Sequence, residues 1–298
     1  MKLSVAFEEF LDFATLERCL SSNTINWYRR CFKPFVKYLR YDLLATDTSI
    51  LTADNLRKYF VSQRLHGNTP RTILNSMQGI RSFCVFLVKK GHLTSNPVDS
   101  LEKPKLQRRL PEFLNEEESR ELLTACINLK SIFKSKWVRD IAIISLFLFT
   151  GVRRKELLNL KLGDLNLERG YIKVSAKNKE RLVPLNSTAK EFLVDYLKAR
   201  PERGVDYLFV STNRNGGLTS QGLYDIFKNL KQQVNFHKKI SPQILRHTFC
   251  TLMLRNGVNI RDIQLLAGHS DISTTAKFYL GCDEKQLKKA VDKHPLNI

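Results

Sequence analysis

The stretch ISPQILRHTFCTLMLRNGVNIRDIQLLAGHSDISTTAKFYL, residues 240–280, contains three side chains that suit one phosphate group. Arg246 is a permanent cation whose planar fork of N–H donors fits phosphate oxygens. His269, 23 residues later, can donate a hydrogen bond or a proton. Tyr279, ten residues further on, carries a phenol that can attack as an oxygen nucleophile. Together these groups predict phosphoryl transfer through a covalent intermediate on the enzyme.

The same stretch resembles the C-terminal signature of the tyrosine recombinase family, which includes phage integrases and Xer-like enzymes. The matching residues are 245–249 (LRHTF), 266–270 (LAGHS) and the pair Thr274-Thr275 with a tyrosine shortly after it. The whole pattern is specific, whereas RHTF or GH alone is a weak signal. The resemblance implies that Arg246, His269 and Tyr279 act on one DNA phosphodiester.

A second match lies at residues 150–157, TGVRRKEL, which fits the family box TGxRxxEL. Three consecutive basic residues at a predicted helix N-terminus oppose the helix dipole, so they indicate an anion site rather than a gain in stability. The resemblance implies that Arg153 is the first phosphate-binding arginine and that Glu156 orients neighbouring groups. The alternative for Glu156 is an ordinary carboxylate on the helix surface.

A hairpin lysine is the third element of the resemblance. The sequence SAKNKERLVPL, residues 175–185, is similar to the family string GKGNKERLVPL. In the family a lysine of this hairpin protonates the leaving 5′ oxygen. Lys177 lies 24 residues after Arg153, the usual family offset, and Lys179 is the alternative.

Two positions depart from the family pattern. Gln243 stands where the family usually has histidine, and a glutamine amide can donate a hydrogen bond but cannot transfer a proton. The family tyrosine usually follows the histidine by nine residues, a position that Phe278 occupies here. Tyr279 is one residue later, about 100° further around a helix. Either Tyr279 attacks, or the chain is inactive, or a tyrosine at 278 has been replaced.

Helical periodicity predicts four helices between residues 5 and 90, and they resemble the core-binding (SAM-like) domain of the family. Prolines at 97, 104 and 111 together with Arg108-Arg109 predict a linker. Beyond it we expect helices at 116–128 and 136–149, with the apolar run 141–149 buried. Alternating stretches at 165–167, 171–174 and 181–183 predict a three-stranded antiparallel sheet. Helices that carry the signature complete the chain.

The predicted fold class is mostly α with a small antiparallel β-sheet. We expect a DNA-binding helical domain at residues 1–92, a linker at 93–111 and an α+β catalytic domain at 112–298.

The charge balance favours a polyanionic partner. The 298 residues include 49 Lys+Arg and 29 Asp+Glu, a formal net charge of +20. Six scattered cysteines without CxxC spacing predict reduced thiols, no zinc site and a cytoplasmic protein. The longest apolar run is too short to span a bilayer.

We therefore expect a site-specific recombinase that cleaves and rejoins double-stranded DNA through a 3′-phosphotyrosyl link. The resemblance implies a homotetramer on two DNA sites and no metal, nucleotide cofactor or small-molecule substrate. Two alternatives are a member of the fold that binds DNA without cleaving it and a type IB topoisomerase-like relaxase.

Overall fold

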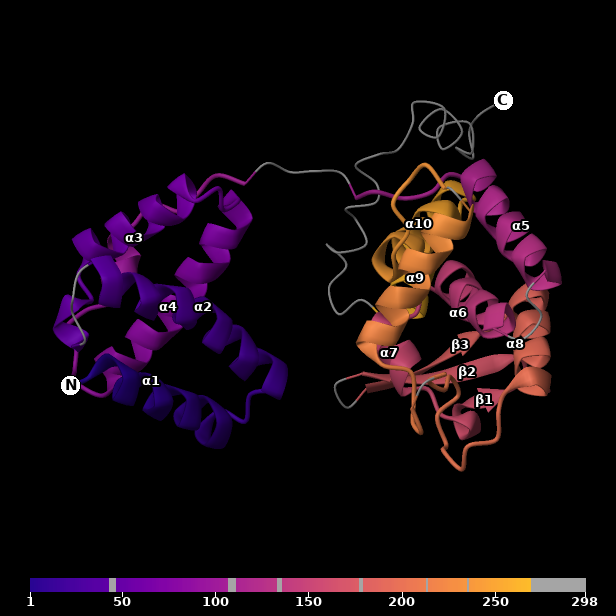
Figure 1. The fold of residues 1–298 in the computed structure, drawn as a ribbon, viewed down its shortest axis with the longest axis horizontal. Helices are drawn as coiled ribbons and strands as arrows, with labels where there is room; N and C mark the ends of the chain where they lie inside the picture. The colour runs from indigo at the N-terminus through magenta and orange to yellow at the C-terminus, as the bar shows by residue number, and fades with distance from the viewer. Residues whose placement is uncertain are drawn as a thin grey trace, which may run out of the picture. The chain divides into compact units, whose positions relative to one another are not determined.

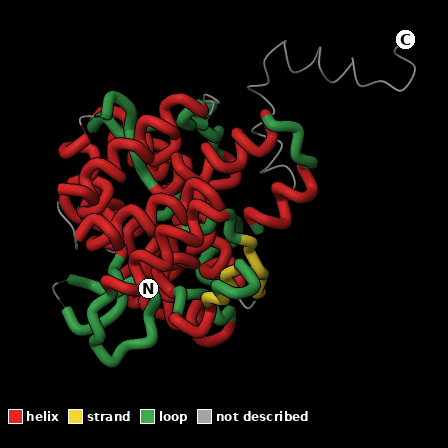
Figure 2. The backbone as a smooth tube through the Cα atoms, turned by 90° about the vertical axis from the view of Figure 1, so that its right-hand side faces the viewer, coloured by secondary structure: helices red, strands yellow, loops and turns green. Residues whose placement is uncertain are grey.

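The computed structural model describes residues 1–42, 47–106, 111–132, 136–176, 179–212, 214–234 and 236–268. The chain divides into two compact units, Met1–Arg108 and Arg109–Ile298, and each has its own hydrophobic core. Figure 2 shows most of the backbone as helix, with the strands confined to one small region. The predicted fold class, mostly α with a small antiparallel sheet, is confirmed.

The first unit contains four α-helices, with one π-helical and two 3-10 segments among its described residues (Figure 1). The side-chain oxygens of Thr52 and Thr69 accept hydrogen bonds from the first turns of the third and fourth helices, so these two N-termini are capped. The four helices predicted between residues 5 and 90 are confirmed. The elements are α1 (Leu3–Asp12), the π-helical turn η1 (Phe13–Glu17), α2 (Ser22–Asp42), the 3-10 helix η2 (Thr48–Ile50), α3 (Ala53–Leu65), α4 (Pro70–Lys89) and the 3-10 helix η3 (Pro97–Ser100).

Aromatic rings form the centre of this core. Phe7 of α1 stacks on Phe32 of α2, with ring centroids 3.6 Å apart and an interplanar angle of 6°. Phe83 of α4 meets both rings edge-on, at 5.6 and 5.1 Å. These contacts join α1, α2 and α4. The three phenylalanines lie on the apolar faces that the helical spacing of the sequence predicts.

The start of the predicted linker folds onto the first unit. Asn96 caps η3, which packs against α3 and α4, and Val98 is buried in the first core. Arg81 of α4 also pairs with Asp99 at 2.6 Å, although this ion pair is exposed and contributes little stability. The prolines and charges of this stretch therefore mark a segment whose first part is ordered.

The second unit combines seven α-helices, one 3-10 helix and three strands among its described residues (Figure 1). They are α5 (Glu116–Ile132), α6 (Lys136–Thr150), α7 (Arg154–Asn159), the 3-10 helix η4 (Leu162–Asp164), β1 (Leu165–Asn166), β2 (Tyr171–Ala176), β3 (Lys179–Pro184), α8 (Ser187–Ala199), α9 (Ser220–Val234), α10 (Pro242–Arg255) and α11 (Ile260–Ala267). The predicted helices at 116–128 and 136–149 and the three-stranded sheet are confirmed.

Helix α6 lies at the centre of the second core. Its residues from Ile141 to Leu148 are buried, as the apolar run predicted, and α5, α8 and α10 pack against it. At its C-terminal end Gly151 turns the chain with φ of +60° and lies against Phe249 of α10. This packing fixes where α7 begins relative to α10.

The sheet has the order β1-β2-β3, and both pairings are antiparallel. Val174 of β2 is opposite Arg181 of β3, and Ala176 is opposite Lys179. Since alternate residues of a strand point to the same face, Arg181 shares its face with the buried Val183. None of the described helices combines the length and the hydropathy that a bilayer crossing needs.

Gly79 provides a test of the packing between α2 and α4. A Cβ at this position would lie 2.7 Å from Cys31 Cβ and 2.9 Å from its Sγ. A glycine-to-alanine change inside a helix ordinarily stabilises by about 1 kcal/mol. We expect Gly79→Ala instead to lower the free energy of unfolding by about 1–3 kcal/mol, because the methyl group overpacks the crossing. Urea denaturation of the full chain, followed by circular dichroism, measures the change.

The matched control is Gln78→Ala, which alters an exposed position of the same helix. It should change the free energy of unfolding by less than about 0.5 kcal/mol. A stabilised Gly79→Ala variant would contradict the close crossing of these helices.

Candidate active site

The turn between α6 and α7 places the first predicted arginine. Arg153 is the N-cap residue of α7, with extended backbone (φ −78°, ψ 152°), so the helix itself starts one residue later. Its backbone N–H donates to Glu156 Oε2 at 2.7 Å, and its guanidinium donates to Glu156 Oε1 at 2.7 Å. Glu156 therefore has two roles: it caps the first turn of α7, and it orients the side chain of Arg153.

Glu156 is not a surface carboxylate. Its side chain has no exposed area, and Arg181 of β3 binds it with both terminal nitrogens, at 2.7 and 2.9 Å. Burial alone would raise the pKa of this carboxyl, but the hydrogen bonds from Arg181 and Arg153 lower it to about 2. Glu156 is consequently ionised at neutral pH.

Arg246, the second predicted arginine, projects from α10 and is buried. One terminal nitrogen donates to Gly151 O, and the other donates to Ala267 O at 2.6 Å. Burial, and after it the charge of Arg153, lower the pKa of Arg246 to about 10, so that the guanidinium stays protonated at neutral pH.

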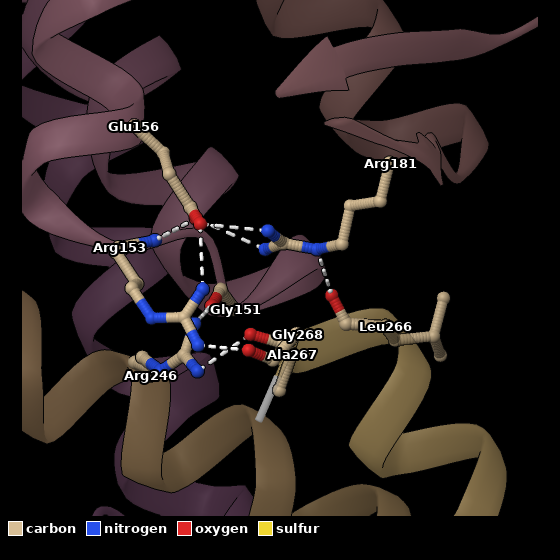
Figure 3. A network of polar contacts seen from close by, with 8 residues as sticks. All are labelled: Gly151, Arg153, Glu156, Arg181, Arg246, Leu266, Ala267 and Gly268. Atoms are coloured by element: carbon tan, nitrogen blue, oxygen red, sulfur yellow. Dashed lines mark hydrogen bonds and ion pairs between the residues drawn. The ribbon is translucent and has the colours of Figure 1, made fainter. Parts of the chain in front are cut away.

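The C-terminal end of α11 binds all three arginines. The carbonyl oxygens of Leu266, Ala267 and Gly268, which a helix leaves without intrahelical partners, accept from Arg181, Arg246 and Arg153 respectively. Figure 3 shows the guanidinium groups of Arg153 and Arg246 side by side at these carbonyls.

Gly268 ends α11 in the left-handed conformation, with φ of +65°. A Cβ there would lie 2.8 Å from Arg181 Nη1 and 3.0 Å from Arg153 Nη1. Glycine is needed both for the backbone conformation and for the close approach of two guanidinium groups.

Arg153 and Arg246 also line one cavity of about 1170 Å³ in the second unit. Among the described residues that line it none is acidic, while six are Lys or Arg: Arg153, Arg154, Lys228, Lys231, Lys239 and Arg246. Apolar side chains of α9 form much of the remaining wall. Such a cavity favours an anion that also has an apolar or planar part.

The structure brings together two of the five predicted site residues, Arg153 and Arg246. The other three, Lys177, His269 and Tyr279, lie outside the described residues, as does Phe278. The alternative acid Lys179 is the first residue of β3 and is exposed. Gln243 is an exposed residue of the first turn of α10 and lines the same cavity as Arg246.

His247 lies next to Arg246 on α10. It is partly buried and forms a hydrogen bond with the backbone of Glu112. Burial lowers the pKa of this imidazole, so it remains neutral at physiological pH.

Sequence reasoning missed Arg181. Its spacing from Val183 places a charged side chain on the buried face of a strand, which signals a buried partner. That partner is 25 residues away, and no local pattern identifies it.

Residues 112–286 match the phage integrase family, and residues 7–91 match the phage integrase N-terminal SAM-like domain. The chain belongs to the phage integrase family. The predicted resemblance and the enzyme class, a tyrosine recombinase, are confirmed.

Curated relatives agree with this membership over nearly the whole chain. The tyrosine recombinase XerD of Listeria monocytogenes serovar 1/2a is 36% identical over 276 residues, which cover 90% of this chain and 91% of the relative. The tyrosine recombinase XerD of Oceanobacillus iheyensis is 35% identical over 282 residues, 92% of each chain.

Solved structures share the integrase fold. The Tn1549 transposon integrase in complex with transposon right end DNA has a TM-score of 0.78 and 18% identity, with 98% of this chain and 99% of that chain covered. The XerH recombinase bound to palindromic difH substrate has a TM-score of 0.76 and 22% identity, with coverage of 93% and 81%.

The ionised carboxylate of this integrase makes its stability depend on pH. A pKa lowered from 4.5 to about 2 corresponds to roughly 3 kcal/mol of stabilisation at neutral pH. This contribution is complete above the unfolded pKa and is lost as the pH falls through the folded value. Glu156→Gln should therefore lower the free energy of unfolding by roughly that amount at pH 7, and the difference should shrink between about pH 5 and 2. Urea denaturation across this range measures it.

Glu121→Gln, an exposed change on α5, serves as the control and should follow the wild type throughout. A constant difference between Glu156→Gln and wild type at every pH would contradict an ionised Glu156.

Proposed function

We propose that this chain is a site-specific DNA recombinase that cuts and rejoins double-stranded DNA. The observation that carries the proposal is the convergence of Arg153 and Arg246 on one basic cavity beside the end of α11. Family membership supports it, and solved neighbours such as XerH and the Tn1549 integrase are complexes with DNA.

The proposed reaction forms one phosphate ester bond for each one that it breaks. The Tyr279 oxygen attacks phosphorus, a 3′-phosphotyrosyl bond forms, and the bond to the 5′ oxygen breaks. Lys177 gives a proton to that leaving oxygen, and the phenol releases its own proton to solvent water. Rejoining is the reverse attack by a 5′ hydroxyl. Since the tyrosyl ester conserves the phosphate ester, no nucleotide cofactor is needed.

Arg153 and Arg246 stabilise the negative charge that grows on the non-bridging oxygens. Both guanidinium groups are tethered by backbone carbonyls, so their remaining N–H donors are held in place before DNA arrives. Replacing either by alanine should cost about 3–4 kcal/mol of transition-state stabilisation, by analogy with other lost oxyanion donors.

Gln243 and His269 complete the proposed set as hydrogen-bond donors. Gln243 lies one helical turn before Arg246 and lines the same cavity, so its amide is placed to reach a phosphate oxygen. Because an amide cannot carry a proton to or from the reacting group, its contribution is electrostatic.

The other basic residues of the cavity, and further ones in the first unit, provide additional DNA contacts. Arg154, Lys228, Lys231 and Lys239 would bind flanking phosphates without reading sequence, so binding should weaken as salt rises. In the first unit Arg29, Arg30 and Lys33 of α2 are exposed and provide further phosphate contacts. Recombination joins two duplexes, for which we propose a homotetramer on two DNA sites in the cytoplasm.

The nucleophile is tested with a nicked duplex that traps the covalent intermediate. The wild-type chain should form a denaturation-resistant adduct, and mass mapping should place the DNA on Tyr279. Tyr279→Phe should form none, because it lacks the attacking oxygen. Tyr171→Phe, which removes a phenol from β2, is the matched control and should form the adduct normally.

An adduct on another residue would reject Tyr279. If the wild type forms none but Phe278→Tyr does, the chain is a DNA-binding protein whose nucleophile has been lost. Relaxation of supercoiled plasmid without exchange between two sites would favour the topoisomerase-like activity.

The general acid is tested with a substrate whose bridging 5′ oxygen is replaced by sulfur. A thiolate leaves without a proton, so this substrate bypasses the acid. We expect Lys177→Ala to cleave ordinary DNA about 10²–10⁴-fold more slowly and to recover on the sulfur substrate. Lys179→Ala is the matched control and should cleave both substrates like wild type. The reverse pattern would assign Lys179 as the acid, and no selective recovery in either variant would exclude both.

A further inference from the structure

Arg181 connects two parts of the proposed site that are far apart in the sequence. Its Nη1 and Nη2 donate to the two oxygens of Glu156 at 2.7 and 2.9 Å, and its Nε donates to Leu266 O at 2.9 Å (Figure 3). All three guanidinium nitrogens are thereby engaged by the protein.

The position of Arg181 argues against contact with the substrate. Its side chain is 18% exposed, and it is not among the residues that line the cavity with Arg153 and Arg246. Its N–H donors therefore do not reach a phosphate in this cavity, and what it contributes to contacts there comes through the groups that it holds.

Those groups are the ones that hold the two cavity arginines. Glu156 fixes Arg153 through its backbone N–H and its guanidinium. The end of α11, to which Arg181 is bound at Leu266, receives Arg246 at Ala267 and Arg153 at Gly268. Apart from Arg153 itself, Arg181 is the only side chain in the described part of the chain that binds both supports.

We propose that Arg181 is a positioning residue for strand cleavage, which holds Glu156 and the end of α11 so that Arg153 and Arg246 meet the phosphate in fixed geometry. The inference rests on the proposed function and deepens it.

The chemistry of Glu156 makes the proposal testable. Among the described residues, the charged groups that face its carboxylate are Arg153 from the start of α7, Arg181 from β3 and, further off, Arg246 from α10. Without Arg181, burial would favour the protonated carboxyl, which cannot accept on both oxygens as a carboxylate does. Arg153 would then lose the partner that orients it. The defect should grow as the pH falls.

The experiment compares full-length wild type with Arg181→Met, Arg181→Lys, Arg181→Met/Glu156→Gln and the control Arg169→Met. Arg169 lies in the exposed β1–β2 turn, and its replacement also removes one positive charge. Three quantities are measured: the single-turnover rate of adduct formation on a nicked duplex at saturating protein, the Kd for uncut duplex, and the rate between pH 5.5 and 8.

We expect Arg181→Met to slow adduct formation at pH 7 by about 10–100-fold, by analogy with residues that orient the ligands of a metal site. Its Kd should stay within about threefold of wild type, since the side chain does not reach the cavity. The rate relative to wild type should fall as the pH falls. The double variant should be slow but show no such pH dependence, because its amide does not titrate. Arg181→Lys should recover part of the rate.

A rate for Arg181→Met equal to that of Arg169→Met overturns the inference. So does a raised Kd with an unchanged rate, which would make Arg181 a DNA contact. Circular dichroism shows whether each variant is folded. The double variant lacks the unpaired buried charge of Glu156, so it separates the loss of rate from misfolding caused by that charge. A pH-independent loss shared by the single and double variants also overturns it. If wild type forms no adduct, the proposed function fails as well, whereas an active wild type with an unaffected Arg181→Met refutes only the role of Arg181.

Discussion

The interaction on which this site depends is the buried carboxylate of Glu156. Three arginines from α7, β3 and α10 meet within one small region, and their like charges repel one another in surroundings that water screens poorly. Glu156 offsets one charge directly through Arg153 and Arg181. Two positive charges remain in excess, and they lie at the wall of a cavity whose described lining has no acid. A phosphodiester supplies a negative charge there. The excess positive charge lowers the stability of the protein without a ligand, and it favours the binding of an anion.

The end of α11 contributes the second part of this balance. Three successive carbonyl oxygens carry the partial negative charge of a helix C-terminus, and each accepts from a different arginine. These three hydrogen bonds fix the position of the last turn of α11 relative to α7, β3 and α10. The predicted histidine follows directly after Gly268, so whatever fixes these carbonyls also fixes the point from which the remaining residues of the chain begin.

The sequence predicted most of the fold because its signals were local. Helical spacing and a buried run of apolar residues each act within a few positions. They predicted the four helices of the first unit, and they predicted α6 almost to the residue. The proximity of Arg153 and Arg246 came from resemblance alone, since 93 residues separate them. The burial of Glu156 and the role of Arg181 depend on pairs between α7, β3 and α11, which form only when the sheet packs beside both helices. Local sequence patterns do not indicate such pairs. The one local signal is that Arg181 has the same strand periodicity as the buried Val183.

Tethering the arginines has a consequence for catalysis. A free arginine side chain must lose rotamer freedom when it binds a phosphate, and that entropy reduces the stabilisation it provides. Here Arg246 is held at both terminal nitrogens and Arg153 at two groups, so folding has already restricted them. The guanidinium has five N–H donors, and these contacts leave others for the non-bridging oxygens. The oxygens of a phosphate bound there then meet dipoles and charges that need not reorganise.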